Sequence, residues 1–142
     1  MMNKGRNILM VVALAILASS VAWAGGLKII ANSSVQGKSI SAAELKSVYL
    51  EEKNSLSDGT HVQPVLTKGG PSYETFVRDY LDKSDPALQI YYRSLVFTGK
   101  GLMPKLVHSD ADMVAYIVKT KGAIGYVSSG ASVEGVKVLE VK

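Results

Sequence analysis

A glycine-rich turn holds the residues best suited to bind an anion. Residues 65–76 (VLTKGGPSYETF) combine a short apolar stretch, a Gly-Gly pair and the start of a helical pattern. Glycines let the backbone approach a ligand closely, and a helix that begins behind them presents unpaired N–H groups with a partial positive charge. Side-chain hydroxyls and one ammonium group add further donors. The predicted anion site comprises Thr67, Lys68, Gly69, Gly70, Ser72 and Tyr73, with Lys100 as a second contributor.

A plain strand-to-helix turn is the alternative interpretation of the same residues. In it Ser72 caps the helix, and Pro71 removes an N–H group that an anion cradle would use. Local spacing alone favours this alternative, because Gly-Gly pairs are common. The segment around Lys100 (TGKG, residues 98–101) likewise needs no ligand to explain it, since glycines there would simply end a helix.

The sequence offers little support for an enzyme. His61 and His108 stand far apart with no metal-ligand spacing, and no serine lies in a nucleophile elbow. Asp110 and Asp112 are typical of a helix start rather than of a catalytic pair. No phosphate-binding P-loop or dinucleotide fingerprint is present. We therefore expect a protein that is not an enzyme, with no metal and no cofactor.

Helices and strands alternate along the chain. Apolar or alternating stretches predict strands over 27–31, 60–66, 123–127 and 136–141, with Pro64 at a strand edge or end. Apolar residues at helical spacing predict four helices, beginning near Ser41, Pro71, Ser84 and Ser109. This interleaving predicts one α/β domain.

The first 24 residues have the organisation of a secretory signal peptide. Lys4 and Arg6 precede the apolar run 8–18, and Ala22-Trp23-Ala24 provides a small-residue cleavage site. An uncleaved N-terminal anchor is the alternative, although the run is shorter than the roughly 20 residues of a spanning helix. Cleavage would leave residues 25–142 as the folded domain. The chain contains no cysteine, which fits an exported periplasmic protein better than a small disulfide-stabilised extracellular one. We expect no stable membrane insertion after signal cleavage.

The charge of the chain is mild. The formal net charge of +4 falls to +2 when Lys4 and Arg6 leave with the signal peptide. Acidic and basic residues are interspersed without a Lys/Arg run, so we expect no nucleic-acid partner.

Taken together, several segments resemble the phosphate-binding proteins of ABC transporters. They are AELKSVYL (43–50), DGT (58–60), PV (64–65), FTGKG (97–101), SD (109–110) and GAIGYV (122–127), which is the most specific piece. The resemblance runs from about Leu27 to Val127 and places the Gly69-Gly70 turn where that family holds its anion. It differs in the turn itself, because the family has an Arg and an Asp there and this chain has neither.

The resemblance implies a three-layer α/β domain like the type II periplasmic-binding proteins, with a mixed sheet flanked by helices. Family members are over twice as long and close two lobes around the anion, so this chain would supply one lobe. The implied function is periplasmic binding of phosphate or a related oxyanion, linked to ABC-type uptake or sensing through an ABC permease or another envelope protein. The alternative is a protein-interaction module that retains the fold with a vestigial ligand site.

Overall fold

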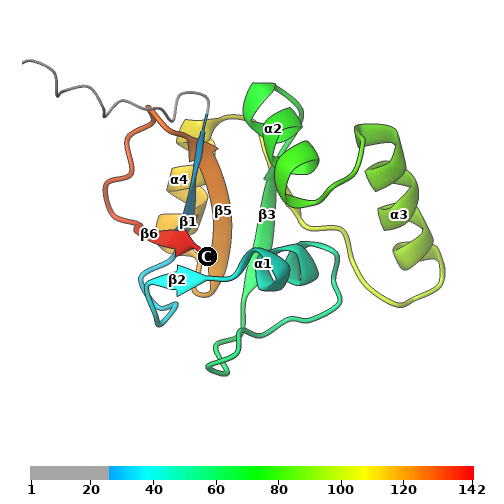
Figure 1. Ribbon diagram of the computed structural model, residues 1–142, viewed down its shortest axis with the longest axis horizontal. Helices are drawn as coiled ribbons and strands as arrows, with labels where there is room; N and C mark the ends of the chain where they lie inside the picture. The colour runs from blue at the N-terminus through cyan, green and yellow to red at the C-terminus, as the bar shows by residue number, and fades with distance from the viewer. Residues whose placement is uncertain (1–25) are drawn as a thin grey trace, which may run out of the picture.

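The computed structural model describes residues 26–142, so the predicted signal peptide lies outside the described residues. Within them the chain forms ten elements (Figure 1). They are β1 (Leu27–Ala31), β2 (Ser39–Ile40), α1 (Ala42–Tyr49), β3 (Gln63–Thr67), α2 (Pro71–Tyr80), α3 (Asp85–Phe97), β4 (Lys105–Val107), α4 (Asp110–Lys119), β5 (Ala123–Ser128) and β6 (Lys137–Val141). Among these residues no helix has the length and apolar character needed to cross a membrane.

The strands form one mixed six-stranded sheet in the order β2-β6-β1-β5-β3-β4. β1 lies antiparallel to both of its neighbours, β5 and β6. β3 lies parallel to β5 on one side and to β4 on the other. The carboxyl ends of β3, β4 and β5 therefore meet at the same edge of the sheet.

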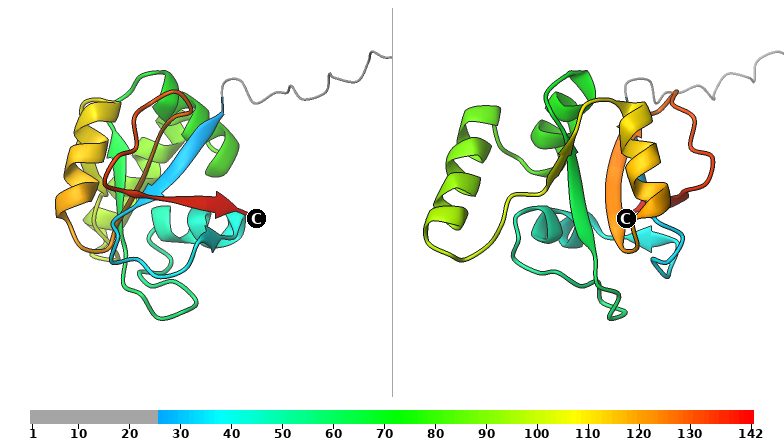
Figure 2. Two further views of the ribbon diagram at one scale, coloured as in Figure 1. Left: turned by 90° about the vertical axis from the view of Figure 1, so that its left-hand side faces the viewer. Right: turned by 180° about the vertical axis from the view of Figure 1, so that it is seen from behind.

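Successive residues of β5 show why helices cover both faces of the sheet. Gly125 faces α4 so closely that an added Cβ would lie 2.5 Å from Met113 Sδ and 2.7 Å from Ile117 Cδ1. Side chains alternate along a strand, so Tyr126 points to the opposite face. Its ring stacks there on Phe76 of α2, with 4.2 Å between the ring centroids. Figure 2 shows the resulting three layers, with α4 on one side of the sheet and α1 and α2 on the other.

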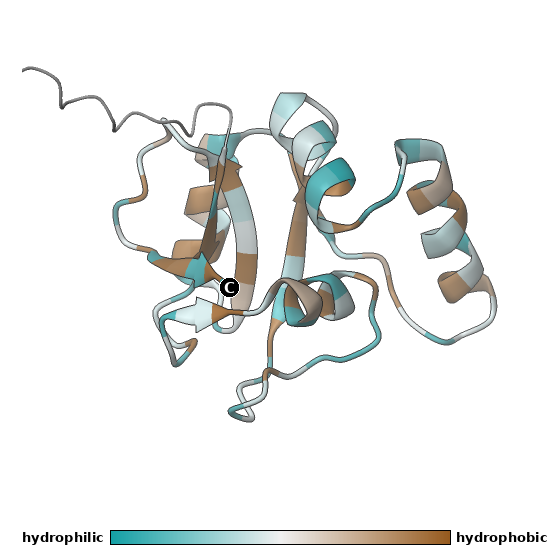
Figure 3. Ribbon diagram, viewed as in Figure 1, coloured by the Kyte–Doolittle hydropathy of each residue, from teal (hydrophilic) through white to brown (hydrophobic). Residues whose placement is uncertain are grey.

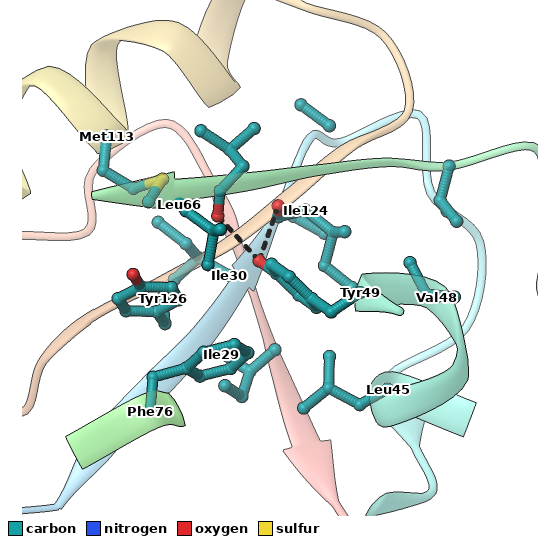
Figure 4. Close-up of a cluster of buried hydrophobic side chains, with 14 of the residues drawn as sticks. Ile29, Ile30, Leu45, Val48, Tyr49, Leu66, Phe76, Met113, Ile124 and Tyr126 are labelled. Carbon is teal, nitrogen blue, oxygen red and sulfur yellow. Dashed lines mark hydrogen bonds between the residues drawn. The ribbon is translucent and has the colours of Figure 1, made fainter. Parts of the chain in front are cut away.

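The core on the α1–α2 side is aromatic. Hydrophobic residues concentrate on the strands (Figure 3), and Tyr49 packs edge-on against Phe76 with 4.6 Å between ring centroids. The buried Tyr49 hydroxyl donates to the carbonyls of Val65 at 2.8 Å and Ile124 at 3.1 Å (Figure 4). Burial raises the pKa of Tyr49 well above its usual value, so the phenol stays protonated and can serve as a donor.

All four helices begin where the sequence predicts, and three of them have the expected serine cap. Ser41, Ser84 and Ser109 each precede a helix, and each side chain accepts a hydrogen bond from the N–H group three residues on. The fourth helix, α2, begins at Pro71 with Gly70 as its N-cap and has no side-chain cap. The alternative in which Ser72 caps this helix is therefore wrong.

The predicted strands need two corrections. β3 spans Gln63–Thr67 rather than 60–66, with Pro64 near its start as expected. Two further strands, β2 and β4, were not predicted and contain two and three residues. Strands that short show no measurable alternation of polar and apolar residues.

Candidate anion-binding site

A hollow of about 340 Å³ lies at the sheet edge where β3, β4 and β5 end. Its lining comes from three segments, namely the β3–α2 turn, the start of α4 and the end of β5. The lining residues are Thr67, Gly69, Gly70, Pro71, Ser72, His108, Ser109, Asp110 and Ser128. Ligands of open α/β sheets bind at this position, outside the carboxyl ends of the strands.

The hollow exists because β3 changes partners along its length. Its first residues pair with β5 at Gln63↔Ala123 and Pro64↔Ile124, whereas Val65 to Thr67 pair with β4. Beyond Pro64, tyrosine hydroxyls take the place of the β3–β5 backbone pairing. Tyr49 bridges the carbonyls of Val65 and Ile124, and the Tyr126 hydroxyl accepts from Thr67 N at 2.9 Å. The end of β3 is thus held apart from β5.

The β3–α2 turn presents backbone donors to this hollow. Gly69 and Gly70 have φ angles of 77° and 95°, values that glycine adopts readily. The first intrahelical bond of α2 runs from Glu74 N to Gly70 O at 3.0 Å. The N–H groups of Ser72 and Tyr73 come before it and have no acceptor among residues 26–142. They remain available to a ligand.

A buried hydroxyl pair adds a further donor. Thr67 is only 4% exposed, and its Oγ1 lies 2.9 Å from the Tyr126 hydroxyl. Burial raises the pKa of Tyr126 to about 12, so both hydroxyls carry a proton near neutral pH. One of these protons serves the bond between them. The second hydroxyl proton has no acceptor in the described chain. Because Thr67 lines the hollow, the pair can direct this proton towards a ligand in the hollow.

The start of α4 closes the other side of the hollow. Asp110 Oδ2 accepts from Ser128 N at 3.1 Å and from Ser128 Oγ at 2.8 Å, which ties β5 to α4. The Ser109 hydroxyl accepts from Asp112 N at 3.0 Å. Two helices of ten residues, α2 and α4, therefore begin at this hollow and direct the positive ends of their dipoles towards it.

The structure brings together four of the seven predicted site residues, namely Thr67, Gly69, Gly70 and Ser72. Lys68 lines a different hollow beside β4, which Thr67, Gly69 and Tyr73 also border. The Tyr73 hydroxyl donates to Asp85 Oδ1 at 2.6 Å, so only its backbone N–H is left for an anion. Lys100 belongs to the connection between α3 and β4 and borders neither hollow.

Sequence reasoning missed the residues on the far side of the hollow. His108, Ser109 and Asp110 follow β4, and Ser128 ends β5. The usable signal was the predicted strand 123–127, whose end must share an edge with any parallel neighbour. His108 is exposed, and together with Asp110 it supplies the ionisable side chains that line the hollow. Within residues 26–142, no three His, Cys, Asp or Glu side chains are grouped to hold a metal ion.

The chain is similar to known proteins in structure but matches none of them at the level of sequence family. No family model matches the chain, and no curated protein matches it significantly. Among solved structures, an ABC-type phosphate transport receptor from Vibrio cholerae aligns over 82% of this chain with a TM-score of 0.62 and 16% identity. A putative phosphate ABC transporter substrate-binding protein from Clostridium perfringens, with bound phosphate, aligns over 82% with a TM-score of 0.63 and 14% identity. PstS from Borrelia burgdorferi aligns over 82% with a TM-score of 0.60 and 13% identity.

The chain shares their fold. This confirms the α/β architecture that the sequence predicts and the mixed sheet between two helical layers that the resemblance implies. The alignments span 46%, 44% and 47% of the three longer chains, so this chain covers less than half of each.

Proposed function

We propose that this chain binds phosphate or a related oxyanion in the hollow between the β3–α2 turn and the start of α4. The observation that carries the proposal is the convergence of two helix N-termini and the buried Thr67–Tyr126 hydroxyl pair on one hollow. The fold shared with phosphate-binding transport proteins supports it. We place this binding protein in the periplasm, linked to ABC-type uptake or sensing through a permease or another envelope protein, rather than among enzymes.

The donors on the α2 side suit an oxyanion. The free N–H group of Ser72 binds one oxygen, with that of Tyr73 next along the helix start, and the Ser72 hydroxyl and the Thr67–Tyr126 pair reach others. No Lys or Arg lines this hollow. Binding therefore rests on helix dipoles and neutral donors. We expect weaker binding than an arginine-clamped, enclosed site would give.

Asp110 gives the site a preference among oxyanions. Its Oδ2 is occupied by Ser128, whereas Oδ1 accepts no hydrogen bond from any described residue. A free carboxylate oxygen repels a fully ionised anion but accepts a hydrogen bond from an anion that carries a proton. Phosphate retains a proton near neutral pH and sulfate does not. The site therefore favours phosphate over sulfate.

Thermal unfolding with and without phosphate tests the proposal. A ligand that binds only the native state stabilises it by RT ln(1 + [L]/Kd), which is about 2.7 kcal/mol at a hundredfold excess over Kd. We expect a rise in Tm with millimolar phosphate, and its reduction by at least half in Ser72→Ala.

Ser132→Ala is the matched control, because Ser132 is an exposed serine outside the hollow. It should leave the shift unchanged. The absence of a shift with phosphate, sulfate or any other oxyanion would contradict the proposal, and an undiminished shift in Ser72→Ala would place the site elsewhere.

A further inference from the structure

One end of the molecule exposes an unusual number of large apolar side chains. Figure 1 and the right-hand view of Figure 2 show α3 at this end, with the connection that returns to β4. Of the eight large hydrophobic side chains exposed in the described chain, six lie between residues 90 and 106. They are Ile90, Val96, Phe97, Leu102, Met103 and Leu106. We call the exposed side chains of residues 90–106 the α3 tip.

Folding does not require the outward face of α3 to be apolar. The inward face is already anchored, because Leu88 and Tyr92 are fully buried and the Tyr92 hydroxyl donates to the Tyr49 carbonyl at 2.6 Å. Ile90 and Phe97 stand two turns apart on the opposite face. Two apolar residues at that spacing form a stripe directed away from the body of the protein.

Phe97 protrudes at the end of α3, and the backbone beneath it is fixed by its own hydrogen bonds. Phe97 is 93% exposed, and Leu102, which is 75% exposed, borders a shallow hollow beside Glu51. Gly99 has a φ of 72°, and Lys100 N donates to the Leu95 carbonyl at 2.9 Å, which closes the turn beneath α3. Gly101 packs against Leu95 and Glu51. The apolar side chains are therefore held outward by an ordered turn.

The charged residues of segment 90–106 are all basic. Residues 90–106 include Arg93, Lys100 and Lys105 and contain no Asp or Glu. Behind the tip, Glu51 is partly buried, which raises the pKa of its carboxyl, and Glu52 is exposed beside it. Lys105 Nζ lies over the Tyr116 ring of α4, 5.4 Å from its centroid, so Arg93 and Lys100 are the basic groups that accompany the exposed Phe97.

We propose that the α3 tip docks reversibly on an anionic lipid surface. Phe97 and Leu102 enter the boundary between headgroups and acyl chains, while Arg93 and Lys100 pair with acidic headgroups. A second copy of the chain fits less well, because a self-complementary contact would bring the basic groups of both copies together. A protein partner would need a preformed pocket for the protruding Phe97, whereas a bilayer accepts a protruding side chain anywhere on its surface.

A fluorescent reporter on the tip tests this docking directly. The chain has no cysteine, so Ser94→Cys carries a single nitrobenzoxadiazole label between Ile90 and Phe97. We expect its emission to shift to the blue and gain intensity with vesicles that contain about 30% phosphatidylglycerol, and to stay unchanged with pure phosphatidylcholine. The shift should weaken as NaCl rises from about 0.05 M to about 0.5 M. The same label at Ser132→Cys should not respond.

Substitutions within the tip then separate its apolar and basic parts. In the labelled Ser94→Cys protein, Phe97→Ser should weaken binding to anionic vesicles at least about tenfold. Arg93→Gln combined with Lys100→Gln should weaken this binding by about fivefold per charge removed. Val138→Ser removes an exposed apolar side chain of β6, and Lys119→Gln with Lys121→Gln removes two exposed charges elsewhere. These controls should bind like the parent protein.

Three results would overturn the proposal. They are no response of the Ser94 label to anionic vesicles, equal responses to anionic and neutral vesicles, and full binding by the Phe97→Ser variant. The first result would instead leave the tip as a surface for a protein. Phe97 is almost fully exposed, so its replacement should leave the Tm unchanged, and the charge variants test docking independently.

Discussion

At the scale of single residues, the direction of a side chain decides which groups can meet an anion. Thr67 is the last residue of β3 and Lys68 follows it, yet the two differ in which hollows they border. Thr67 borders the hollow shared with Ser109 and Ser128, and Lys68 borders only the other. Composition alone ranks Lys68 as the better anion ligand, whereas geometry favours the neutral Thr67.

The preference for a protonated anion rests on one carboxylate and can be tested at that residue. Asp110→Asn removes the negative charge while keeping an oxygen that can accept from Ser128. We expect phosphate affinity to fall and sulfate affinity to rise, which changes their ratio by about tenfold. Titration calorimetry with both anions measures it. Asp112 lies two residues further along α4 and outside the hollow, so Asp112→Asn should leave the ratio of the two affinities unchanged. An unchanged ratio in Asp110→Asn would remove Asp110 from the site.

At the scale of elements, the sequence predicts what is local. Capping serines and helical spacing identify Ser41, Ser84 and Ser109 as helix starts because each cap bonds within its own first turn. The half of the site contributed by residues 67–72 was predictable for the same reason. In the other half, the end of strand 123–127 and the helix start at Ser109 were predictable, but their meeting was not, because β4 is too short for a pattern and the Asp110–Ser128 contact joins residues 18 apart through the fold.

In the GAIGYV segment (122–127), the packing of α4 against β5 leaves no room for a side chain at Gly125. A Cβ on Gly125 would lie 2.5 Å from Met113 Sδ, so Gly125→Ala should destabilise the fold by about 1–3 kcal/mol. Met113→Ala frees that space, and the double variant should be more stable than the sum of the two single effects predicts. Urea unfolding of the single and double variants measures this coupling. Gly130→Ala has open space around it and should be nearly neutral. Strict additivity would show that Gly125 is not limited by Met113.

At the scale of the whole molecule, the chain covers less than half of each longer structure that shares its fold. It nevertheless has a hydrophobic core of its own, with aromatic residues at its centre. Tyr49, Tyr92 and Tyr126 are fully buried, and burial raises the pKa of each. Their hydroxyls bond to backbone groups of other elements, with Tyr92 donating to Tyr49 O at 2.6 Å. The fold therefore depends on phenols that remain protonated.

Alkaline pH should unfold the protein through these three tyrosines. In the unfolded chain a tyrosine loses its proton near pH 10, whereas the buried phenols keep theirs, up to about pH 12 for Tyr126. Above pH 10 the native state thus binds more protons than the unfolded state, so stability must fall as pH rises. These three groups contribute a slope of roughly 4 kcal/mol per pH unit, and the partly buried Tyr73, whose pKa is also raised by burial, adds to it. Urea unfolding at pH 8, 10 and 11 measures it. Tyr126→Phe should lower the slope by roughly 1.4 kcal/mol per pH unit, whereas Tyr116→Phe, on the less buried face of α4, serves as the matched control. Equal stability at pH 8 and pH 11 would mean that the phenols ionise without unfolding the core.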